Sequence, residues 1–76
     1  NTLYPNPFEH EINIKVDSSY IEAEVSVFNV IGQSLFNKVY NNSELIKIPT
    51  EDFQNGQYLI KMNIDGKISI KRAIKD

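Results

Sequence analysis

The fold is decided by one stretch late in the chain, YLIKMNIDGKISIKRAIK, residues 58–75. Its first part carries an apolar side chain at every second position, the period of a half-buried β-strand: Tyr58, Ile60, Met62 and Ile64. Asp65-Gly66 follows, a dipeptide typical of a two-residue hairpin turn. Residues 67–75 are therefore predicted to return antiparallel. The apolar row is predicted to continue there, interrupted by Arg72, in Ile68, Ile70 and Ile74.

The same alternation recurs upstream and predicts further short strands, at residues 12–16, 21–30, 35–40 and 45–48. One face of the second is predicted to carry Ile21, Ala23, Val25 and Val27. Polar or glycine-containing turns separate the strands, at residues 17–19, 31–33 and 41–43, with Gly32 suited to a positive φ. Residues 50–54 form the one stretch that fits a helical turn. The pattern predicts an all-β fold, a small antiparallel immunoglobulin-like β-sandwich of about seven short strands.

Composition limits the function classes. A chain of 76 residues is one small domain, spanning residues 1–76, and its lack of cysteine leaves no disulfide framework. The formal net charge of −2 argues against nucleic acid as a partner. No apolar run approaches the roughly 18 residues that span a bilayer, so no transmembrane segment is predicted.

The segment Leu3-Tyr4-Pro5-Asn6-Pro7-Phe8 reads as a domain boundary. Each proline fixes φ, removes a hydrogen-bond donor and favours an extended residue before it. We expect an extended, hydrogen-bond-poor entry segment over residues 1–8 that follows an upstream linker.

Candidate catalytic and metal-binding residues are few. His10 is the only histidine and reads as an exposed loop residue, so a zinc site and a serine-histidine arrangement are not expected. Calcium is weakly suggested by oxygen ligands at turns, Asp17, Ser18 and Asp65. Glu22 and Glu24 share one strand face and are interpreted as solvated. The sequence therefore predicts no enzyme, no metal and no cofactor.

Three surface features admit more than one interpretation. The tyrosines Tyr4, Tyr20, Tyr40 and Tyr58 would suit a sugar-stacking platform, although Tyr58 begins an apolar row and is expected in the core. The sequon Asn41-Asn42-Ser43 is interpreted as a turn. Basic residues gather in the last predicted strand: Lys67, Lys71, Arg72 and Lys75. They protect an edge strand from pairing, or they form a recognition tag on an available edge.

The order of the motifs carries a resemblance. The proline segment comes first, followed by an Ile-x-Ile strand at Ile12, the stretch at residues 25–33, the stretch at residues 55–61, and a final hairpin ending in residues 71–75. Together they resemble the C-terminal sorting domain of type IX secretion substrates, the Por secretion tail family of Bacteroidetes. Asn29 departs from the pattern, since such domains often carry aspartate there, and asparagine serves a turn nearly as well.

The resemblance implies a non-catalytic signal at the end of an exported protein. Such domains pass the periplasm, are recognised by an outer-membrane translocon and its shuttle protein, and are removed by a sortase-like peptidase cutting upstream. The cargo is anchored at the cell surface or released.

The resemblance and the basic tail together suggest site residues. Translocon recognition is assigned to the end of the last strand, at Lys71, Arg72, Ile74 and Lys75. Residues of the family motifs are expected mainly to hold the fold, at Pro5, Asn6, Pro7, Gly32, Gly56 and Tyr58. A weak dimer through an edge strand is compatible with this assignment. The alternative is an immunoglobulin-like or fibronectin-like accessory module that binds carbohydrate or mediates adhesion.

Overall fold

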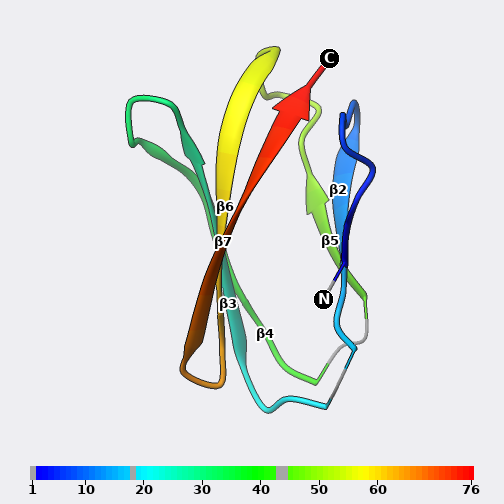
Figure 1. Ribbon diagram of the computed structural model, residues 1–76, viewed down its shortest axis with the longest axis vertical. Helices are drawn as coiled ribbons and strands as arrows, with labels where there is room; N and C mark the ends of the chain where they lie inside the picture. Colours follow the sequence, from blue (N-terminus) through cyan, green and yellow to red (C-terminus); the bar gives the residue numbers. More distant parts are fainter. Residues whose placement is uncertain (1, 18, 43–44) are drawn as a thin grey trace.

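Two antiparallel sheets face each other in the computed structural model, which describes residues 2–17, 19–42 and 45–76. The strands are β1 (Thr2–Tyr4), β2 (Glu11–Lys15), β3 (Ala23–Asn29), β4 (Ser34–Tyr40), β5 (Leu45–Pro49), β6 (Gly56–Ile64) and β7 (Lys67–Lys75). One sheet has the order β1-β2-β5 and the other β4-β3-β6-β7 (Figure 1). The predicted all-β sandwich of about seven strands is confirmed. Among the described residues, no helix is long and apolar enough to cross a membrane.

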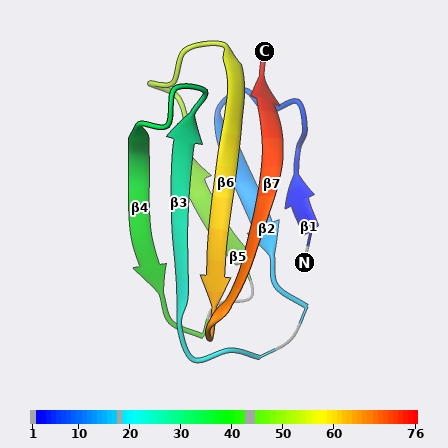
Figure 2. The same cartoon turned by 60° about the vertical axis from the view of Figure 1, so that its left-hand side comes forward.

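The core lies between the sheets and is built from alternate residues of their inner faces. The fully buried large side chains are Phe8, Ile12, Ile14, Val25, Val27, Ile46, Ile48, Thr50, Ile60 and Met62. Figure 2 shows the four-stranded sheet in front of β2 and β5. Burying this aliphatic surface is the main driving force for folding in a chain without disulfides.

The hairpin between β6 and β7 forms at the predicted turn. Asp65 and Gly66 both have positive φ, +49° and +91°, as a type I′ turn requires. The Asn63 side chain accepts a hydrogen bond from the Gly66 amide at 3.0 Å. The turn also anchors the start of β3, because the Asp65 carboxylate accepts hydrogen bonds from the Ile21 and Glu22 amides.

The predicted apolar row on β7 was wrong, because its isoleucines face away from the core. Ile68, Ile70 and Ile74 are 60%, 61% and 42% exposed. The register explains this result. A two-residue turn pairs Ile64 with Lys67, and paired residues share a face of the sheet. The inward positions of β7 are therefore the odd-numbered ones, among which Ala73 and Lys75 are buried.

Two further expectations need correction, and two predicted turns lie partly outside the described residues. Ile21 lies before β3 and is 80% exposed, because the segment bends there to reach Asp65. Residues 51–53 form a turn, closed by a 3.0 Å hydrogen bond from the Phe53 amide to the Thr50 carbonyl, and no helix. The predicted turns at residues 17–19 and 41–43, together with the sequon, include Ser18 and Ser43, which lie outside the described residues.

The proline segment belongs to the fold to a greater extent than predicted. β1 pairs with β2 just before the first proline, and Leu3 packs partly against the core. The Tyr4-Pro5 and Asn6-Pro7 peptide bonds are cis. Phe8 is fully buried, and its ring lies 5.9 Å from that of Tyr58. The segment from Tyr4 to Phe8 therefore crosses between the two sheets, with residues 4–7 exposed and Phe8 anchored in the core.

Candidate functional site

The end of β7 is held from its outer side by the proline segment. The Asn6 side chain accepts a hydrogen bond from the Ile74 amide at 3.1 Å and donates one to the Arg72 carbonyl at 3.4 Å. The Phe8 amide donates to the Ile74 carbonyl at 2.9 Å, and the Asp76 amide donates to the Phe8 carbonyl at 3.1 Å. We call this set of hydrogen bonds the clasp. Because of the clasp, the last residues of β7 have a partner on both sides. The proline segment is therefore richer in hydrogen bonds than the sequence predicted.

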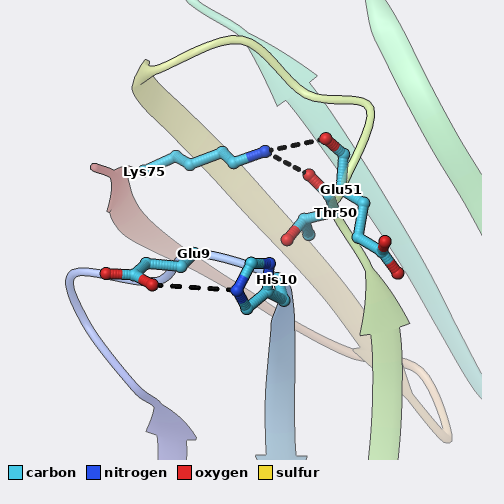
Figure 3. Close-up of polar contacts among 5 residues, drawn as sticks. All are labelled: Glu9, His10, Thr50, Glu51 and Lys75. Carbon is cyan, nitrogen blue, oxygen red and sulfur yellow. Dashed lines mark hydrogen bonds and ion pairs between the residues drawn. The ribbon is translucent and has the colours of Figure 1, made fainter.

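A second contact holds β7 from inside the sandwich. The Lys75 side-chain nitrogen donates to three backbone carbonyls, those of Thr50 at 2.6 Å, Glu51 at 3.1 Å and Phe53 at 2.6 Å. Figure 3 shows the side chain reaching to this turn while the Glu51 carboxylate points away. Three carbonyl acceptors match the three donors of an ammonium group. Lys75 is only 8% exposed. The three carbonyl oxygens therefore solvate its ammonium group in place of water.

The predicted recognition residues therefore separate into two groups. Arg72 and Ile74 project from the outer face of β7 and are exposed, beside Ile68 and Ile70. Lys71 and Lys75 point toward the other sheet, where Lys71 is half-buried and interacts electrostatically with the Asp17 carboxylate. The structure thus places four exposed side chains in one row on the outer face of β7: Ile68, Ile70, Arg72 and Ile74.

A hollow adjoins this row on the same face. It has a volume of about 200 Å³ and is lined by Val30, Gln57, Tyr58, Leu59 and Arg72. Leu59 pairs with Arg72 across β6 and β7, and Gln57 pairs with Ile74. The Arg72 guanidinium therefore stands between apolar side chains on a face open to a partner.

Comparison with known proteins supplies the family. The model of the secretion system C-terminal sorting domain matches residues 2–76, almost the whole chain. The chain belongs to this family. The sorting domain is 38% identical over 61 residues to β-agarase A of Zobellia galactanivorans, a match that covers 80% of the chain and 11% of that protein. The chain thus spans about a tenth of the length of the curated relative it matches.

Membership confirms the resemblance to type IX sorting domains of Bacteroidetes. The sorting domain is a C-terminal secretion signal, and such signals direct their proteins to the cell surface or the medium. Sorting-signal domains are generally non-catalytic.

The family-motif residues lie at conformationally demanding or packed positions of the sorting domain. Gly32 closes the turn between β3 and β4 with a φ of +87°, and Gly56 opens β6 with a φ of +147°. A β-carbon would meet no atom within 4 Å at either position, so the requirement for glycine is one of backbone conformation alone. Tyr58 is 5% exposed, stacks on Phe53 at 5.2 Å and donates to the Gln54 carbonyl. Pro5 and Pro7 flank Asn6 in the clasp segment.

The remaining candidates for chemistry stand apart from one another. His10 is exposed and lies 3.8 Å from the Glu9 carboxylate (Figure 3). Glu24 is exposed and accepts a hydrogen bond from the Asn37 side chain at 3.2 Å. The Asp65 carboxylate is engaged by backbone amides, and these bonds from Glu22 and Ile21 lower its pKa. Within residues 2–17, 19–42 and 45–76, no three His, Cys, Asp or Glu side chains form a metal-binding group.

The tyrosines of the sorting domain do not form a common platform. Tyr20 and Tyr58 are buried, at 6% and 5% exposure, and Tyr40 is half-buried. Tyr4 is 41% exposed on β1. Tyr20 is unavailable for a sugar-stacking platform because its side chain joins the core.

Sequence reasoning missed the carbonyl acceptors of Lys75 and the bonds of Asn6. The side chain of Lys75 is aliphatic along most of its length, and its place at an inward position followed from the hairpin register. No pattern indicates the backbone oxygens of Thr50 and Phe53, since any residue supplies a carbonyl.

Proposed function

We propose that the outer-membrane translocon of the type IX system, with its shuttle protein, recognises this domain in its folded form at β7. Arg72 and Ile74 make the direct contacts, while Lys71 and Lys75 hold the strand that presents them. The exposure of Arg72 and Ile74, beside Lys75 bound to three carbonyls, is the observation that supports this division. A folded signal offers a fixed geometry, so its recognition costs less ordering entropy than that of a flexible tail.

After export, a sortase-like peptidase removes the domain by cutting in a linker upstream of β1, at the cell surface. The pairing of β1 with β2 supports a cut before Thr2, because backbone paired in a sheet is unavailable to a peptidase cleft. Residues 1–76 thus act as one sorting domain, and the cargo is anchored or released. Any self-association through an edge strand is weak and incidental.

The experiment fuses a signal peptide and a fluorescent cargo to this domain in a type IX-competent host. Export of the cargo to the surface or medium is expected for the native sequence. Arg72→Ala and Ile74→Ala should each lower export severalfold with little change in stability, because both side chains are exposed. Lys47→Ala removes an exposed cation from β5 in the opposite sheet and should export normally.

Point variants are preferable to deletion of the tail. Removing residues 70–76 also removes buried Ala73, the bonds of Lys75 and half of the clasp. Loss of export after such a deletion would follow from unfolding alone. Retained cargo in the periplasm with the native domain would contradict the proposed function.

A further inference from the structure

The outer edge of β7 is open over only part of its length. β7 is the last strand of its sheet and pairs with β6 on one side. On the other side the clasp covers the backbone from Arg72 onward. In the described part of the chain, no strand pairs with the outer edge from Ile68 to Ile70.

The backbone groups of this open stretch point outward at known positions. Ile74 turns both its amide and its carbonyl to the clasp, away from β6. Backbone orientation repeats every second residue in a strand, so Ile68 and Ile70 direct theirs the same way. The side chains of the same two residues are 60% and 61% exposed. Free backbone groups beside exposed apolar side chains are the arrangement that strand addition uses.

The opposite edge of the sheet, β4, is protected in a way that β7 is not. A register shift interrupts its pairing with β3 at Val27 and Phe28. A bulge on an edge discourages pairing, and the printed register of β6 with β7 has none. Of the two edge strands, β7 is therefore the one better suited to pair with an added strand.

The charges beside the open stretch select the partner. Lys67 and Lys71 lie on the inward face of β7, opposite to the face that carries the two isoleucines, and Lys67 is exposed. A second copy of this chain paired at the same edge would bring these cations toward cations, whereas an acidic strand would bring carboxylates to them.

We propose that residues 68–70 accept an extended strand of a partner protein in which apolar and acidic residues alternate. This inference rests on the proposed function and assigns the mode of contact at the same strand. The added strand hydrogen-bonds to Ile68 and Ile70, lays apolar side chains along them on the outward face, and places carboxylates on the inward face near Lys67.

The first test uses a blocked hexapeptide of alternating valine and glutamate as the probe. Amide hydrogen exchange at Ile68 and Ile70 should slow by about tenfold at saturating peptide, as expected when an open edge becomes paired. A peptide with lysine in place of glutamate, and one N-methylated at alternate residues, should leave exchange unchanged. Equal protection by all three peptides, or by none, overturns the proposal. Protection that rises with the concentration of the domain alone assigns the edge to a second copy and also overturns it.

The second test uses export of the fused cargo. Ile70→Pro removes an outward amide without breaking the pairing with β6, a substitution that edge strands tolerate. It should lower export about tenfold, while Ile70→Val, which keeps the donor and the branched side chain, should export normally. Thermal unfolding identifies a misfolded Ile70→Pro, in which case the peptide series alone decides. Normal export by a folded Ile70→Pro overturns strand addition but leaves the proposed function intact, whereas failure of the native fusion counts against the proposed function alone.

Discussion

The side-chain nitrogen of Lys75 lies 2.6 Å from the backbone carbonyl oxygen of Thr50, two sites separated by 25 residues. The contact joins the end of β7 to the turn that precedes β6, and the carbonyls of Glu51 and Phe53 complete the coordination. A lysine that sequence reasoning assigns to an exposed basic tail thus stabilises the interior. This arrangement leads to the first prediction.

Lys75→Met should destabilise the domain by about 2–3 kcal/mol. It removes a charged donor of three hydrogen bonds and leaves the three carbonyls that it binds without their partner. Methionine keeps much of the aliphatic volume, so the loss of stability reports on the ammonium group. Urea unfolding of the two proteins measures the difference in their free energies of unfolding. Lys67→Met, at an exposed position of the same strand, is the control and should change stability by less than about 0.5 kcal/mol.

Asn6→Ala should loosen the clasp. It removes the acceptor of the Ile74 amide and the donor to the Arg72 carbonyl, at a cost of about 1 kcal/mol. Hydrogen exchange should accelerate at the Ile74 and Asp76 amides and stay unchanged in the β3–β4 pair. Uniform acceleration across both sheets would contradict a local role for Asn6.

Asp65 should make stability depend on acid pH. Hydrogen bonds from the Glu22 and Ile21 amides lower its pKa below the ordinary value of 3.8. A carboxyl whose pKa is depressed by folding stabilises the native state above that ordinary value, and the contribution is lost as pH falls through the folded pKa. Asp65→Asn tolerates the same positive φ but lacks this titration, so it should be less stable than the native domain at pH 6. Thermal unfolding midpoints should converge as the pH is lowered to about 2. A constant difference across this range would exclude Asp65 as the source.

Thr50→Val should leave the domain as stable or raise its stability by up to about 1 kcal/mol. The Thr50 side chain is fully buried, and its hydroxyl has no hydrogen-bond partner among the described residues. Valine has the same shape without the polar atom, so it removes the cost of burying an unpaired hydroxyl. The backbone amide of Thr50, which donates to the His10 carbonyl at 3.0 Å, is unaffected. Calorimetric unfolding of the two proteins compares them directly, and marked destabilisation would show that the hydroxyl has a partner.

The strands were predictable because their signals are local. The alternation in residues 58–64 and the Asp65-Gly66 turn fixed β6, β7 and their register. That register also determines that Ile68 and Ile70 face away from the core, a consequence that the apolar pattern taken alone obscured. The alternation gives the period of a strand, and only pairing says which face is buried.

The site was harder to predict because its contacts are distant in sequence. The bonds of Asn6 to β7 span 66 and 68 residues. An X-Pro-Asn-Pro segment indicates its local backbone conformation, but the partner of its side chain depends on how the two sheets stack. The burial of Phe8 and Tyr20 follows from the same stacking. Both residues sit in segments that sequence composition assigns to loops.

The clasp also has a kinetic consequence. Closing the chain between Asn6 and Ile74, 68 residues apart, requires a large loss of chain entropy before any of its hydrogen bonds form. Such nonlocal β-topologies fold on the order of milliseconds to seconds, slowly for their size. We therefore expect the clasp to close late, after the local β6–β7 hairpin has formed. A chain that stops before Ile74 lacks the residue that Asn6 binds, so the clasp fixes the end of the isoleucine row only in molecules synthesised through to that residue.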